Sequence, residues 1–199
     1  MNNQNTTDAH QQKWQAYLQG NDQAFETLYN TFMDRLYVYG CNLTVDVALV
    51  EDAIQEIFYK LYQRDKTMVE VKNIRSYLFV ALRNHIRKSL STDRNHDKHE
   101  KRYQAMQPVC EEVPVPAVNG EERRLHSAVK VAIEALPPRQ KEVLCLRYYQ
   151  GFDYHEISEV MNISYQVARN YASRGMKRLR KQLFTECHAQ TFQVAMAGF

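Results

Sequence analysis

The residues best suited to chemistry lie near the C-terminus, in the stretch SYQVARNYASRGMKRLRKQL at 164–183. It carries six Arg or Lys and lies within an acid-free run from Val160 to Thr185. Gln and Asn can pair with adenine and Arg with guanine in the major groove, whereas cations also bind phosphates. The amides come early and most cations late, as a DNA-recognition helix requires. At helical spacing one face holds these polar side chains: Tyr165, Gln166, Arg169, Asn170, Ser173, Arg174, Lys177, Arg178 and Lys181.

The residues before this stretch complete the pattern of a helix-turn-helix. A short helix from about Tyr154 to Met161 precedes a break at 162–164, where Ile163 can fill the space between two helices and Ser164 can cap the second. A surface helix with a solvated basic face is the alternative, but it would need neither the preceding helix nor the turn. The second helix places its apolar positions on one side: Val167, Ala168, Tyr171, Ala172, Gly175, Met176, Leu179 and Leu183.

Three amphipathic patterns fill the first half of the chain, and a short helix around Trp14 can precede them. The first begins at Asp22, which can cap it, and extends to about Tyr39. The second extends from about Asp46 to Tyr62 and the third from about Asn73 to Leu90. Since each pattern has one apolar face, the three helices can close a bundle around a shared core.

The remaining segments divide the chain. Polar residues and three prolines interrupt the periodicity from about Ser91 to Gly120, and helical patterns resume at Leu125 and again after the Pro137-Pro138 pair. We therefore predict an all-α fold of two small helical domains joined by a flexible linker, the C-terminal one containing the helix-turn-helix. The expected boundaries are a bundle at 1–92, a linker at 93–120, a second domain at 121–184 and a tail at 185–199.

Charge is distributed unevenly along the first domain. No Lys or Arg occurs from Leu36 to Tyr59, and no Asp or Glu occurs from Val71 to Thr92. One helix would therefore be acidic and its neighbour basic, which favours contact with a basic protein on one side and nucleic acid on the other. Chance segregation of charge on solvated faces is the alternative. The formal net charge of +3 comes from the segment 121–183.

Several classes of function are disfavoured by the sequence. It has no Gly-rich phosphate loop, no HExxH and no GxSxG, so we expect no catalytic residue and no enzyme. Four isolated cysteines and the pair His96 and His99 make no convincing metal site, so no metal or cofactor is expected. No apolar run approaches the ~20 residues of a membrane span. The N-terminus lacks the basic and apolar parts of a secretory signal, which predicts a cytoplasmic protein without membrane insertion.

Four motifs together resemble the small bacterial sigma factors of the extracytoplasmic-function group, which direct RNA polymerase to promoters. The resemblance extends from about Gln23 to Leu183. The motifs, in chain order, are AFETLYNTFMDRLYVYG, VEDAIQEIFYKLY, SYLFVALRNHIRKSL and LPPRQKEVLCLRYYQGFDYHEIS.

The resemblance implies a role for each domain. The family's second helix binds the clamp helices of the largest polymerase subunit, which implies that role for Asp52, Gln55 and Glu56. Capture of the −10 element falls to a loop at about Arg64–Asn73 and to the third helix, through Arg83, Asn84, Arg87 and Lys88. The C-terminal domain would contact the polymerase flap and read the −35 element as duplex, through Tyr165, Gln166, Arg169, Asn170, Arg174 and Lys177.

Some features depart from the family pattern or stay open. Asp153 stands where a small hydroxyl-bearing residue is usual, and Val167-Ala168-Arg169 replaces a frequent TVK.

An anti-sigma factor is a further expected partner, and the free protein should be a monomer. A helix-turn-helix activator that binds duplex DNA as a dimer is the alternative function. Whether the two domains pack against each other in the free chain stays open.

Overall fold

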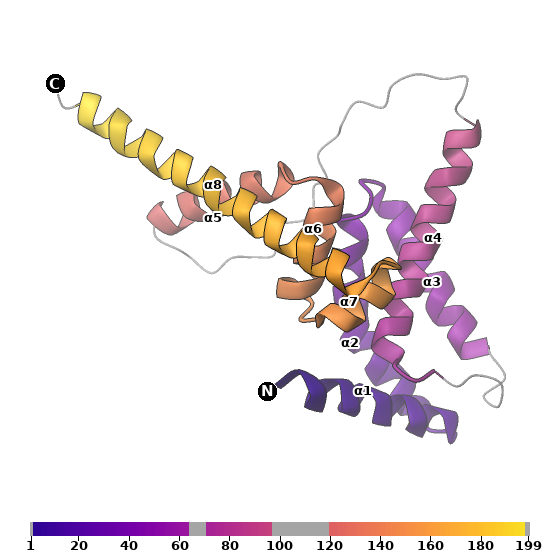
Figure 1. Cartoon of the computed structure of the whole chain (residues 1–199). Coiled ribbons are helices and arrows are strands. Elements are labelled where there is room, and N and C mark those ends of the chain that lie inside the picture. The colour runs from indigo at the N-terminus through magenta and orange to yellow at the C-terminus, as the bar shows by residue number, and fades with distance from the viewer. Residues whose placement is uncertain (1, 64–70, 97–119, 198–199) are drawn as a thin grey trace.

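The computed structural model describes residues 2–63, 71–96 and 120–197. Over these ranges every regular element is helical, which confirms the predicted fold class (Figure 1). The elements are α1 (Asn2–Leu18), α2 (Asp22–Cys41), α3 (Val47–Gln63), α4 (Ile74–His96), α5 (Gly120–Glu134), α6 (Pro138–Leu144), the π-helical η2 (Cys145–Tyr149), α7 (Tyr154–Met161) and α8 (Tyr165–Ala197).

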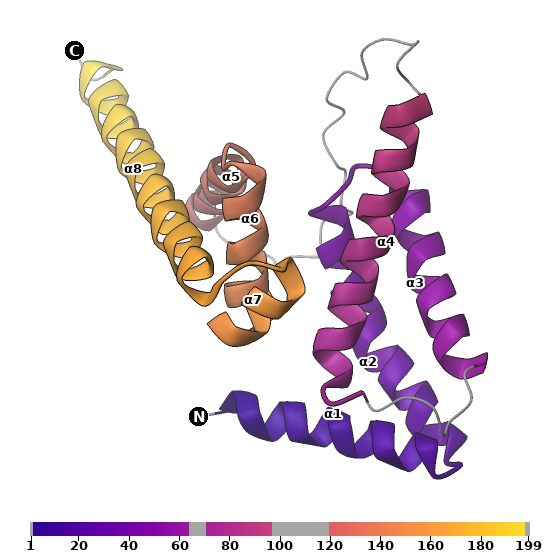
Figure 2. The same cartoon turned by 45° about the vertical axis from the view of Figure 1, so that its right-hand side comes forward.

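Helices α1–α4 form an N-terminal bundle, with α1 crossing the lower ends of the others (Figure 2). The predicted stripes form its core, which includes the fully buried Phe32, Leu36, Val50 and Leu82. Helix α2 and helix α3 approach closely at Gly40, where a Cβ would lie 2.4 Å from a Val50 methyl group. Any larger residue at Gly40 would therefore push the two helices apart.

Two starting residues differ slightly from the predicted ones. Asn21, not Asp22, caps α2, because its side chain accepts the N–H of Ala24. Asn73 instead lies just before α4 and accepts the N–H of Ser76. Short polar side chains at these positions satisfy N–H groups that the helix itself leaves unpaired.

The C-terminal domain, α5–α8, differs from the prediction mainly in its second helix. The helical pattern predicted after the Pro137-Pro138 pair forms α6 followed by the π-helical turn η2, where the Gln150 N–H donates to the Cys145 carbonyl over 3.0 Å. The wider turn adds a residue to the helix and directs Gln150 and Phe152 toward the bundle. Both side chains are buried.

The helix-turn-helix is confirmed as α7, the turn 162–164 and α8. Asp153 caps α7 in a reciprocal capping box with Glu156, so the departure from the family pattern has a local structural role. Asn162 takes a left-handed conformation, φ 50°, and Ser164 accepts the Val167 N–H. Ala168 and Ala172 are buried as predicted, whereas Val167 is 37% exposed.

The N-terminal bundle and the C-terminal domain pack against each other in this structure. Helix α7 lies between α8 and α4, so α4 contacts both domains (Figure 2). Over the residues that the structure describes, no helix is long and apolar enough to cross a membrane.

Candidate functional site

The three acidic and amide residues predicted on the second helix lie together. Asp52, Gln55 and Glu56 line one side of an open groove of about 640 Å³ between α2 and α3. Asp52 and Gln55 are exposed and Glu56 is half-buried. A cationic partner could therefore reach all three from one direction, with charge-assisted hydrogen bonds.

The other side of this groove is aromatic, and no function was predicted for it from the sequence. The ring centroids of Tyr29 and Phe58 lie 4.9 Å apart, and those of Phe25 and Phe58 lie 6.0 Å apart, both edge to face. Tyr59 and Tyr62 are 61% and 55% exposed. We call this surface the aromatic groove, lined by Phe25, Tyr29, Asp52, Gln55, Glu56, Phe58, Tyr59 and Tyr62.

A signal for the aromatic groove was present in the sequence. Tyr59 falls off the apolar stripe of the second helix, so a large ring there had to be exposed. Aromatic side chains with an exposed polar end are enriched at protein interfaces. The groove thus combines apolar area with acidic groups, as expected for binding a basic helical surface.

Glu56 links this groove to a second one, between α3 and α4. Its carboxylate accepts a hydrogen bond from Lys60 and lies 3.4 Å from the His85 Nδ1. The hydrogen bond from Lys60, aided by the charges of His85 and Lys88, lowers the pKa of Glu56. Glu56 therefore stays ionised at neutral pH.

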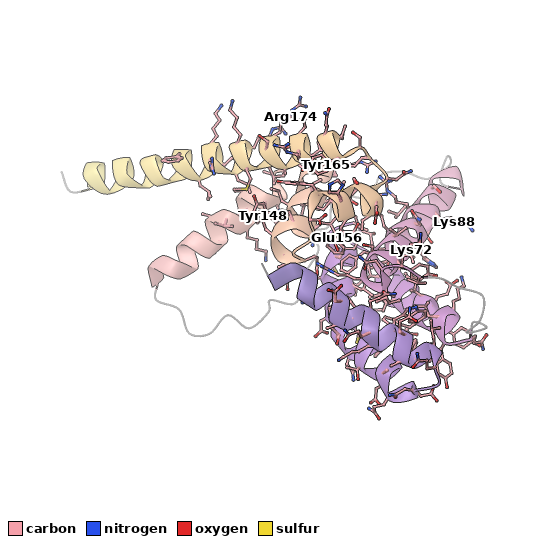
Figure 3. All side chains as sticks on the ribbon, turned by 60° about the horizontal axis from the view of Figure 1, so that its bottom comes forward. Lys72, Lys88, Tyr148, Glu156, Tyr165 and Arg174 are labelled. Atoms are coloured by element: carbon pink, nitrogen blue, oxygen red, sulfur yellow. The ribbon has the colours of Figure 1, made fainter. Side chains whose placement is uncertain are left out.

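The four predicted −10 residues do not share one environment. Asn84 and Lys88 line the second groove, of about 570 Å³, together with Lys60, Tyr77 and His85. Figure 3 shows Lys88 projecting outward from the N-terminal bundle. A groove with two lysines, an amide and a tyrosine suits the phosphates and bases of a nucleic-acid strand. Lys60 and His85 were not predicted as part of this groove, because they lie on different helices and only the fold brings those helices together.

Arg83 points the other way, toward the C-terminal domain. It is 2% exposed, and its Nε donates to the Glu142 carboxylate over 2.5 Å. In this arrangement Arg83 is covered by α6 and cannot contact DNA. Arg87 is exposed, although part of its side chain is desolvated. This desolvation and the charges of Arg83 and Arg139 lower the pKa of its guanidinium.

The loop predicted to capture the −10 element lies mostly at 64–70, outside the described residues, but α1 holds both of its flanks. The Tyr17 hydroxyl donates to the Tyr62 carbonyl over 3.1 Å on one side. On the other side the Gln11 amide donates to the Val71 carbonyl over 2.6 Å and accepts the Ile74 N–H over 3.0 Å. Helix α1 thereby fixes where the loop begins and ends.

The predicted face of α8 is open to solvent along its whole length. Figure 3 shows Arg174 on the side of α8 that faces away from the bundle. Three of the predicted residues, Gln166, Arg169 and Asn170, line a hollow of about 510 Å³. The structure exposes all six side chains predicted for this face: Tyr165, Gln166, Arg169, Asn170, Arg174 and Lys177.

Residues of α7 and η2 complete this hollow. Tyr148 and Tyr154 line it. The Tyr165 ring packs against His155 at 4.6 Å and against Tyr154 at 6.0 Å, and the Arg169 guanidinium lies 5.9 Å from the Tyr165 ring. Tyr165 is therefore held in place rather than free to rotate. The α7 residues were not predicted from the sequence, because base-reading groups were expected only on the second helix of the motif.

No described residues cluster as metal ligands: within 2–63, 71–96 and 120–197, no group of three His, Cys, Asp or Glu side chains could hold a metal ion. The arrangement is instead one of surfaces, namely an acidic and aromatic groove, a cationic groove and an exposed basic helix.

Comparison with known proteins finds a family match within the C-terminal domain. The family model described as Sigma-70, region 4 matches residues 126–179, which contain the helix-turn-helix. The RNA polymerase sigma factor SigZ of Bacillus subtilis (strain 168) is 24% identical over 176 residues, covering 83% of this chain and 90% of SigZ. The ECF RNA polymerase sigma factor SigX of the same organism is 23% identical, covering 81% and 84%.

A solved structure has the same fold. The sigma factor RpoE of Bartonella quintana, in complex with the anti-sigma factor NepR, superposes with a TM-score of 0.55 at 18% sequence identity. The match covers 80% of this chain and 96% of RpoE. The family model accounts for the C-terminal domain, the relatives for both domains, and the solved structure for the fold. The chain is therefore similar to RNA polymerase sigma factors, among them members of the extracytoplasmic-function (ECF) group.

Proposed function

We propose that this sigma factor binds core RNA polymerase through the aromatic groove and contacts promoter DNA through α4 and α8. The observation that carries the proposal is the meeting of Asp52, Gln55 and Glu56 with five aromatic rings in one groove. Clamp helices with basic side chains would find carboxylates, an amide and apolar area there. Residues 1–92 would thus form the polymerase- and −10-binding domain.

The C-terminal domain, 121–184, would read the −35 element as duplex while also contacting the polymerase flap. Gln166, Arg169 and Asn170 lie where the first turns of a recognition helix meet base edges, and Arg174 and Lys177 follow along the phosphates. Asn84 and Lys88 would grip the −10 strand as the duplex separates, and Arg87 would join them. Arg83 would do so only after its release from Glu142.

The protein would act by binding and not as an enzyme. Two weak DNA-binding modules attached to one polymerase gain affinity through effective concentration, so neither has to bind its element tightly alone. Captured bases and the polymerase would supply the free energy of strand separation. Since polymerase and promoters are in the bacterial cytoplasm, we place the activity there. An anti-sigma factor is the further partner that we propose, by analogy with the RpoE–NepR complex.

Run-off transcription with bacterial core polymerase on fragmented DNA from the source organism tests the proposal. We expect defined new start sites that vanish when Asp52, Gln55 and Glu56 are all replaced by Ala. The matched control replaces Asp22 and Glu26 of α2, outside the groove, by Ala. Absence of new start sites with wild-type protein that still binds core polymerase would contradict the promoter-reading half. Loss of activity in the control would contradict the assignment of the groove.

A further inference from the structure

Two arginines are buried between the two domains, and the proposed function does not explain their burial. Arg75 and Arg83 of α4 are 3% and 2% exposed, although arginine is rarely buried without a partner. Both find their partners in the C-terminal domain. We propose that α6 and α7 act as an intramolecular ligand of α4, so that the arginines of α4 bind either the C-terminal domain or nucleic acid. The nucleic-acid half of this inference rests on the proposed function.

Glu142 of α6 is the centre of the contact. It is 4% exposed and accepts hydrogen bonds from the Arg83 Nε over 2.5 Å and from the Tyr39 hydroxyl over 3.0 Å. Arg139 lies 3.8 Å from its second carboxylate oxygen. Burial and the neighbouring Glu142 raise the pKa of Tyr39 well above its usual range, so its hydroxyl keeps the donated proton. We call Tyr39, Arg83 and Glu142 the latch.

A second contact lies nearer the beginning of α4. The Arg75 guanidinium lies 3.9 Å from the centre of the Phe152 ring, donates to the Gln150 carbonyl and is 3.6 Å from Glu156. The Gln150 amide donates to the Arg35 carbonyl over 3.1 Å. Phe152 also packs edge to face on Phe79, with 4.9 Å between centroids. Gln150 caps the π-helical turn and Phe152 follows shortly after it, so this departure from a regular helix leads into the interface.

The composition of the interface indicates that it can open. It joins a few aromatic contacts to buried ionic ones, and buried ion pairs add little net stability because desolvation offsets their attraction. The Arg83 Nη2 is buried without a hydrogen-bond partner among the described residues, and opening would return it to water. A phosphate can replace the Glu142 carboxylate on Arg83, because both accept charge-assisted hydrogen bonds from guanidinium.

The two occupants of α4 exclude each other by geometry. While α6 covers Arg83, a nucleic-acid strand cannot reach that guanidinium, and α7 covers Arg75 in the same way. If the closed form dominates, the apparent affinity for nucleic acid falls by the fraction of molecules that are open. The latch would thus keep the free sigma factor from binding DNA nonspecifically before it meets polymerase.

The substitution Glu142→Gln tests the proposal in the full-length chain. Glu134→Gln is the matched control, since it removes one carboxylate from the exposed end of α5 in the same domain. We would measure the radius of gyration by small-angle X-ray scattering and the binding of a fluorescein-labelled oligothymidylate by anisotropy at low salt. Glu142→Gln should enlarge the radius of gyration and tighten oligothymidylate binding by about tenfold or more, whereas Glu134→Gln should change neither beyond its charge.

Two further variants separate opening from charge. Arg83→Gln should open the chain as much as Glu142→Gln but gain less affinity, because it also removes a phosphate-binding cation. The double variant Arg83→Glu with Glu142→Arg should restore the compact radius of gyration. If Glu142→Gln loses helical circular dichroism, this double variant tests the latch in its place. An unchanged radius in Glu142→Gln, or an open double variant, would overturn the latch. Opening without tighter oligothymidylate binding would overturn the competition.

These readouts separate the latch from the proposed function. Scattering needs neither polymerase nor a promoter, so the latch can stand even if run-off transcription shows no start sites. If start sites appear with the wild-type chain while Glu142→Gln stays compact, the proposed function stands and the latch fails.

Discussion

The arginines of α4 and those of α8 occupy opposite environments although both helices have a basic face. Arg83 is 2% exposed and bonded to a carboxylate of another domain, whereas Arg169 and Arg174 are exposed along α8. The difference shows that a basic stripe on a helix does not by itself identify a free nucleic-acid surface. A distant carboxylate decides whether the stripe faces solvent or the interior of the protein.

Among buried and exposed charged groups, we expect the largest effect from a buried one: lowering the pH should reduce the free energy of unfolding through His10 of α1. His10 is 7% exposed and packs on Phe32, and burial together with Arg35, Arg75 and Lys13 lowers its pKa to about 4. Its pKa in the unfolded chain is about 6.5, so the unfolded state takes up a proton first as the pH falls. Protonation of His10 therefore leaves the free energy of unfolding unchanged above about pH 6.5 and lowers it by about 3 kcal/mol near pH 4.

Urea unfolding followed by circular dichroism between pH 7 and pH 4 measures this loss. The variant His10→Leu keeps an apolar side chain against Phe32 and should show a shallower fall of the unfolding free energy with pH. Equal slopes in wild type and His10→Leu would mean that His10 is protonated in the folded chain, contrary to its buried position.

The next largest effect should separate Arg83 from Arg174. Arg83→Ala leaves Glu142 and the Tyr39 hydroxyl without their partner, so we expect the unfolding free energy to fall by about 2 kcal/mol, limited by the ease with which the domains separate. Arg174→Ala should change it by no more than about 0.5 kcal/mol, as for other exposed residues. Urea titrations at neutral pH compare the two, and equal losses would remove the distinction between buried and exposed arginines.

Substitutions on α8 should change DNA binding and leave the stability of the fold nearly unchanged. Replacing Lys177 by Ala should weaken binding of −35 duplexes of any sequence and reduce the slope of log affinity against log salt by about 1. Replacing Arg169 by Ala should cost about 1–3 kcal/mol on the matching duplex and less on a scrambled one. Anisotropy titrations over a range of salt concentrations distinguish the roles, and an identical pattern for the two variants would argue against base reading by Arg169.

The sequence predicted the fold because its signals are local. Periodic apolar positions, the capping residue Ser164 and the Pro137-Pro138 pair each act within one or two turns, so they identify helices without tertiary information. The acidic and amide residues of α3 were assigned differently: the resemblance to a known family implied the role of Asp52, Gln55 and Glu56.

The features that could not be predicted depend on distant residues. Arg83 and Glu142 are far apart along the chain, and nothing near either residue indicates the other. The π-helical turn directs Gln150 and Phe152 toward the bundle, and no helical periodicity reveals such a turn. The aromatic groove needed Phe25 of α2 beside Tyr59 and Tyr62 of α3, a neighbourhood created only by the fold.

The contacts of α1 on both flanks of residues 64–70 have a consequence for how the sequence between those flanks can vary. Gln11 and Tyr17 bind backbone groups of Val71, Ile74 and Tyr62, not their side chains. Sequence changes within the segment therefore leave its attachment points intact, as long as its length allows the ends to meet them. We therefore expect that residues 64–70 can be exchanged between relatives with a segment of the same length, while α1 and its backbone contacts stay unchanged.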